Sequence, residues 1–148
     1  MSLVLIDSHT KILTGSLLFM AALTMVTLLV MFKRRVRGLR SGEIKVRQFG
    51  TYETEDQMPA YALQGSRHYK NLFEMPVLFY VVVLLAMVTQ TQQLWTSILA
   101  AAFCLVRAWH AFIHLGSNNI ILRMRVFAFS LLILTGLWAL VCSSILLK

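Results

Sequence analysis

Two uninterrupted apolar segments most constrain what this chain can fold into. Neither Ile12 to Phe32 nor Val126 to Leu147 contains a charged residue. A helix of about 20 apolar residues rises roughly 30 Å, which is the thickness of the hydrocarbon core of a bilayer. Charged residues make up only 14% of the chain, against roughly a quarter in soluble domains. The sequence therefore predicts an integral membrane protein.

Two further apolar segments complete a pattern of four helices. We expect them at about 62–89 and about 94–115, between outer helices at about 10–33 and about 122–147. The periods and lengths of these segments predict an all-α bundle of four transmembrane helices, with residues 1–148 forming a single membrane domain. Residues 34–60 are expected to form a cytoplasmic loop.

The basic residues predict the orientation of the bundle. The net charge of +8 comes largely from lysines and arginines that flank the apolar segments, most densely in Lys33 to Arg40. Because basic loops stay on the cytoplasmic side of a membrane, we expect both termini on the other side. This placement of charge argues for contact with membrane lipids and against a nucleic-acid partner.

Pro76 predicts a distortion near the start of the second helix. Proline removes a backbone donor and frees the carbonyl four residues earlier, here that of Leu72. A kink at this point would open space beside Asn71 and Glu74. Alternatively, Pro76 only shapes helix packing, and the sequence leaves both interpretations open.

Polar residues inside the apolar segments gather at the predicted cytoplasmic end. Spacings of three and four residues place them on one face of each helix. Together they predict a cationic pocket for a small anion, ideally one that also has an amine to pair with the single glutamate. Glutathione has this chemistry, although charge alone does not select it over other anions. The residues are Arg67, Asn71 and Glu74 on the second helix, Arg107, His110 and His114 on the third, and Arg123 before the fourth.

This ordered set of residues resembles the MAPEG superfamily of membrane-associated proteins in eicosanoid and glutathione metabolism, and its microsomal glutathione transferases in particular. The resemblance covers residues 60–130 at the level of motifs and the whole chain at the level of hydropathy. The sequence resembles generic, bacterial-type members of this superfamily more than its specialised eicosanoid enzymes. It therefore implies a multi-pass protein of a bacterial inner membrane, assembled as a homotrimer with glutathione sites between subunits.

The resemblance also implies residue roles. Glutathione, as co-substrate, would be held by the six polar residues of the second and third helices, and Arg123 would activate its thiol as the catalytic residue. Arg125 is a rival for that role. A further arginine would come from helix one of a neighbouring subunit, and the sequence does not choose among Arg34, Arg35 and Arg37. His114 and Met75 stand where relatives often have tyrosine.

We therefore expect a glutathione transferase or peroxidase whose thiolate attacks lipophilic electrophiles or lipid hydroperoxides. A non-catalytic lipid- or anion-binding protein on the same scaffold is the main alternative, and a small proton-coupled exporter is a third. Glu74 and Arg107 could also form a purely structural ion pair. His110 and His114 have a spacing that zinc sites use, but the sequence shows no third ligand nearby, so no metal is expected.

Overall fold

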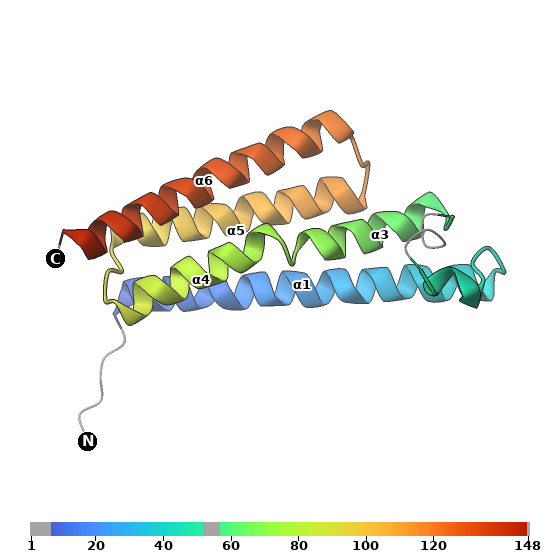
Figure 1. The fold of residues 1–148 in the computed structure, drawn as a ribbon, viewed down its shortest axis with the longest axis horizontal. Coiled ribbons are helices and arrows are strands. Elements are labelled where there is room, and N and C mark those ends of the chain that lie inside the picture. The colour runs from blue at the N-terminus through green and yellow to red at the C-terminus, as the bar shows by residue number, and fades with distance from the viewer. Residues whose placement is uncertain (1–6, 52–56, 148) are drawn as a thin grey trace, which may run out of the picture.

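The computed structural model describes residues 7–51 and 57–147, and its long helices lie side by side along one axis (Figure 1). Four helical segments are long and apolar enough to cross a membrane: Ser8–Arg40, Ala60–Val88, Leu94–Leu115 and Ile120–Leu146. The prediction of an all-α membrane protein with four transmembrane helices is confirmed. The trimer stays a prediction.

Helix α1 spans Ser8–Arg40 and is longer than the sequence predicted. The expectation that a loop begins at residue 34 is wrong, because the basic segment continues the helix. Lysine, arginine and leucine all have good helix propensity, so their charge ends the membrane span without ending the helix. The helix stops at Ser41, directly before Gly42, whose φ of 76° lies in the left-handed region that glycine tolerates. A short 3-10 helix, η1 (Val46–Phe49), follows.

The second membrane segment consists of two helices, α3 (Ala60–Asn71) and α4 (Met75–Val88). A turn at residues 72–74 separates them, and Pro76 lies in the first turn of α4, where its missing N–H costs no helical hydrogen bond. The predicted kink beside Asn71 and Glu74 is therefore confirmed, in the stronger form of a break. The break sets both side chains at the junction of two helices.

Helices α5 (Leu94–Leu115) and α6 (Ile120–Leu146) form an antiparallel pair (Figure 1). Gly116 ends α5, and Asn119 begins α6 by accepting a hydrogen bond from the backbone N–H of Leu122 at 3.0 Å. This short turn brings the C-terminal end of α5 and the N-terminal end of α6 to the same end of the bundle as α3.

The apolar core lies between α1, α4, α5 and α6. Phe79 of α4 stacks on Phe103 of α5 with ring centroids 4.6 Å apart, and both side chains are fully buried. Around them pack Leu13 and Met20 of α1 and other apolar residues of the core. This packing fixes α4 against α5, so the polar residues just beyond the core are held on a rigid frame.

Toward the end of the bundle where α5 ends and α6 begins, α1 and α3 approach each other closely. A Cβ atom at Gly65 would lie 3.2 Å from the Cα of Met31, so glycine permits this approach. Arg34 then ties three helices together: its Nη1 donates to the carbonyl oxygen of Tyr61, and its Nη2 donates to that of Leu115 at 2.7 Å. A cation on the last carbonyls of α5 satisfies groups that the helix itself leaves unpaired.

Candidate functional site

A pocket of about 690 Å³ opens at the end of the bundle where α3 and α5 end and α6 begins. The structure brings six of the seven predicted site residues together in its wall. These six are Arg67, Asn71, Glu74, His110, His114 and Arg123. Lys70, which the sequence analysis did not single out, also lines it. Among the described residues of this wall, two arginines and one lysine stand against one glutamate, so its polar part is cationic.

Arg107, the seventh predicted residue, lies behind this wall. Its side chain is fully buried, and its Nη2 donates a 2.6 Å hydrogen bond to Oδ1 of Asn71. Asn71 in turn donates from Nδ2 to Oε2 of Glu74 at 3.3 Å. The interpretation of a direct Glu74–Arg107 ion pair is therefore replaced by a chain in which Asn71 joins the two charges.

Arg123 lies in the first turn of α6 and is partly buried. Its Nη1 donates a 2.6 Å hydrogen bond to Oδ1 of Asn118, a turn residue with a positive φ of 50°. Arg125, the rival named above, is exposed and is not among the residues that line this pocket. The geometry therefore distinguishes two arginines that the sequence could not.

The apolar part of the pocket wall comes from α6. Its residues follow a spacing of three and four, which places them on one helical face. They are Met124, Phe127, Ala128 and Leu131. The pocket wall thus has a cationic part and an apolar part, and apolar side chains such as Met124, at 63% exposure, reach the surface of the bundle.

His68 also belongs to this region, although it was not among the residues predicted from the sequence. This residue of α3 is fully buried, and its Nδ1 lies 3.1 Å from Nδ1 of His114. Its ring also lies beside that of His110, with centroids 5.6 Å apart. The expectation that no third imidazole lies near His110 and His114 is therefore wrong. The available signal was the position of His68 three residues before Asn71, which puts both on adjacent turns of one face.

The three histidines place one ring nitrogen each within 4.8 Å of one another, a separation that a metal ion could bridge. The surrounding charge does not favour this. Arg67, Arg107 and Arg123 all interact electrostatically with His114, and Glu74 is the only carboxylate among the described residues of the pocket wall. An anion therefore fits this region better than a divalent cation, and we infer no metal from the cluster.

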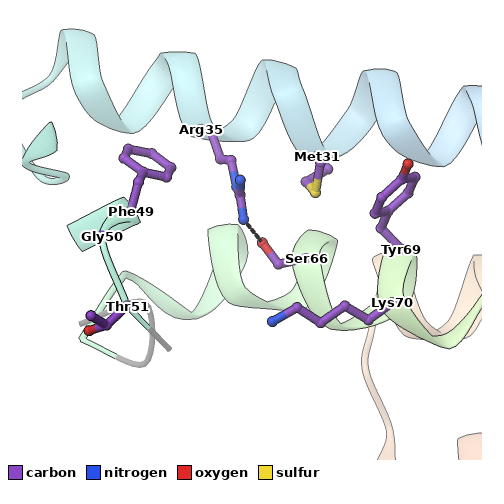
Figure 2. Close-up of a pocket in the computed structure, with 8 residues that line it drawn as sticks. All are labelled: Met31, Arg35, Phe49, Gly50, Thr51, Ser66, Tyr69 and Lys70. Carbon is purple, nitrogen blue, oxygen red and sulfur yellow. Dashed lines mark hydrogen bonds between the residues drawn. The ribbon is translucent and has the colours of Figure 1, made fainter. Parts of the chain in front are cut away.

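A second cavity, of about 470 Å³, lies between α1, η1 and α3 (Figure 2). Figure 2 shows Arg35 reaching from α1 to α3, where its Nη2 donates to Oγ of Ser66 at 2.8 Å. The guanidinium carbon also lies 5.2 Å from the ring centre of Phe49, within the range of a cation–π contact. Tyr69 and Lys70 complete this side of the cavity. Lys70 also lines the first pocket.

The comparisons with known proteins give one match. A family model described as the MAPEG family matches residues 12–143, which is nearly the whole chain. No curated protein and no solved structure matches the chain.

Proposed function

The chain belongs to the MAPEG family, and from this premise we propose that it is a membrane-bound, glutathione-dependent transferase or peroxidase. In the transferase reaction, the glutathione thiolate forms a carbon–sulfur bond to a lipophilic electrophile and displaces its leaving group. In the peroxidase reaction, two glutathione molecules reduce one lipid hydroperoxide to its alcohol and water and become the disulfide. Both reactions need a bound thiolate next to a lipophilic partner.

The observation that carries this proposal is the pairing of two unlike walls in one pocket. The cationic part, from α3, α5 and Arg123 of α6, offers guanidinium, ammonium and imidazole groups, which suit the two carboxylates of glutathione. The wall from α6 offers the apolar side chains of Phe127 and Leu131 to a second, lipophilic substrate. A purely structural ion-pair network would not need the apolar wall.

We assign roles by chemistry. Glu74 is the acceptor for the glutathione amine, and Arg67 and Asn71 are donors to its carboxylates. Arg107, His110 and His114 complete the binding set, with Arg107 acting through Asn71. Arg123 stabilises the thiolate, because a guanidinium next to a thiol favours the ionised and nucleophilic form.

The proposed homotrimer would place a helix-one arginine of a neighbouring subunit at each site. Each of the three candidates already has a partner within its own subunit, and Arg35 donates to Ser66. Arg34 is committed to backbone carbonyls of its own subunit, and Arg37 lies over the ring of Tyr61, 5.9 Å from its centre. Arg35 lines the cavity of Figure 2, on the α1 side of the subunit.

The orientation of the bundle belongs to the same proposal. The start of α1 and the end of α6 lie at one end of the bundle, and the basic end of α1 lies toward the other end, where α5 ends and α6 begins (Figure 1). The positive-inside rule then puts the pocket on the cytoplasmic side and both termini across a bacterial inner membrane. Reduced glutathione would reach the pocket from the cytoplasm, and lipophilic substrates from the bilayer.

A non-catalytic lipid- or anion-binding protein is the second candidate. The histidine at 114 and the methionine at 75 favour it, because tyrosine hydroxyl groups that relatives often offer there are missing. Such a protein would bind an anion in the same pocket without turnover.

Calorimetry of the purified, detergent-solubilised protein with glutathione tests the proposal. Saturable binding that is lost in Arg67→Ala and in Glu74→Ala, but kept in the exposed control Arg47→Ala, would support glutathione binding in the pocket. Turnover of chlorodinitrobenzene or cumene hydroperoxide would then support the enzyme over the binding protein. No heat of binding at millimolar glutathione would overturn the proposal.

A further inference from the structure

The contact between His68 and His114 carries an inference beyond the family-type binding set. The two Nδ1 atoms lie 3.1 Å apart, both rings are buried, and the ring planes meet at 70°. His114 also lines the first pocket, whereas His68 does not. A residue outside the pocket therefore holds the ring of a residue inside it.

The hydrogen bond fixes where the protons are. An N–H···N bond needs one protonated and one unprotonated nitrogen, and a neutral imidazole carries a single ring proton. If His68 donates, the proton of His114 is on its Nε2. If His114 donates, its Nε2 is bare and the proton of His68 is on Nε2.

Burial decides between these two arrangements. Nε2 of His68 is buried and has no hydrogen-bond partner among the described residues. A proton there would be a buried donor without an acceptor, whereas a bare nitrogen there is an unused lone pair. Orphaned buried donors are the rarer of the two in native structures, at least for backbone groups. The arrangement in which His68 donates is therefore the more stable one.

We propose that His68 is a positioning residue that keeps His114 in the tautomer with its proton on Nε2, so that His114 donates a hydrogen bond to an anionic group in the pocket. The anion is a carboxylate or the thiolate of glutathione, and to this extent the inference rests on the proposed function. Arg67 and Arg123 in the same wall attract that anion, and His114 gives it a directed donor. A bare Nε2 would instead turn a lone pair toward it.

Nitrogen-15 NMR of histidine-labelled protein without ligand tests the pair directly. We expect one protonated and one bare Nδ1, and a protonated Nε2 on His114. Asparagine places an amide N–H close to where Nδ1–H of histidine lies, so His68→Asn should keep the His114 spectrum, whereas His68→Leu should change its tautomer. Identical His114 signals in wild type and His68→Leu would overturn the proposal, as would a bare Nε2 in wild type.

Glutathione binding gives the second reading. We expect His68→Leu to weaken binding about tenfold, the loss of one hydrogen bond to a charged group, and His68→Asn to stay near wild type. Thermal unfolding of both variants identifies any loss that comes from misfolding. If His68→Leu folds and binds as wild type does, the positioning role is overturned.

Two controls separate this inference from its rivals. If wild-type protein does not bind glutathione, the proposed function fails, but the ligand-free spectra still decide the histidine pair. Zinc alone, added to wild type and His68→Leu, tests a metal site at the three histidines. A rise in unfolding temperature with zinc that disappears in His68→Leu would overturn the proton arrangement in favour of a metal.

Discussion

Arg107 is fully buried, yet it reaches the pocket through one hydrogen bond, from its Nη2 to Oδ1 of Asn71 at 2.6 Å. Nε and Nη1 of the same guanidinium are buried without partners among the described residues. Asn71 is therefore the hydrogen-bond partner that the structure gives this charge, and it also fixes Glu74. A neutral amide thus couples the stability of the bundle to the shape of the site.

Replacing Asn71 by leucine should cost stability as well as binding. The guanidinium of Arg107 would lose its hydrogen-bond acceptor, and because the side chain is fully buried, water does not take the place of that acceptor. The free energy of unfolding should therefore fall by about 2–3 kcal/mol. Asn71→Asp keeps the acceptor for Arg107 but loses the donor to Glu74, so it should fold well and bind glutathione poorly. Thermal unfolding in detergent measures the first effect and calorimetry the second. Equal unfolding temperatures for wild type and the leucine variant would contradict the assignment.

Arg123→Ala should remove the glutathione thiolate while the fold survives. The side chain lines the pocket and, among the described residues, hydrogen-bonds a turn residue, Asn118, so its loss opens no core cavity. Without the guanidinium the bound thiol should regain its ordinary acidity, and the ultraviolet absorbance of the thiolate should disappear at neutral pH. Arg125→Ala is the matched control, because Arg125 is exposed two residues away. Thiolate absorbance at the wild-type level in Arg123→Ala would remove Arg123 from its role.

The fold was largely predictable because hydropathy and helix length are local properties. The helix at Leu94–Leu115 has the bounds that the sequence predicted, and Pro76 marked the break before α4. The site was predictable as a set of residues, since helical spacing brings them to one face. The hydrogen-bond partners of these residues were not predictable. Arg107 donates to Asn71, whereas the sequence suggested an ion pair with Glu74. His68 of α3 contacts His114 of α5. Such contacts depend on how helices rotate against each other, which periodicity does not specify.

The close approach of α1 and α3 should depend on Gly65. A Cβ atom there would lie 3.2 Å from the Cα of Met31, a backbone atom that cannot rotate away. Gly65→Val should therefore push the helices apart and lower the free energy of unfolding by roughly 1–3 kcal/mol. Gly15→Val on α1 is the matched control, because its Cβ would meet nothing within 4 Å. Thermal unfolding of both variants decides the question, and an equal effect of the two would show that helix propensity, not packing, sets the cost.

The apolar wall of the pocket should govern the lipophilic substrate and leave glutathione unaffected. Leu131 of α6 lines that wall, whereas its neighbour Leu132 is 69% exposed and does not line it. In Leu131→Ser the loss of apolar contact should raise the KM for a lipophilic electrophile about fivefold, because a partial contact with one leucine side chain contributes about 1 kcal/mol, less than its full burial. The KM for glutathione should stay unchanged, and Leu132→Ser should alter neither KM.

Steady-state kinetics with a homologous series of alkyl-chain electrophiles makes the measurement, since the rise in KM should grow with chain length in Leu131→Ser alone. A rise in the KM for glutathione instead would show that Leu131 also shapes the glutathione site, and its assignment to the lipophilic substrate alone would be wrong.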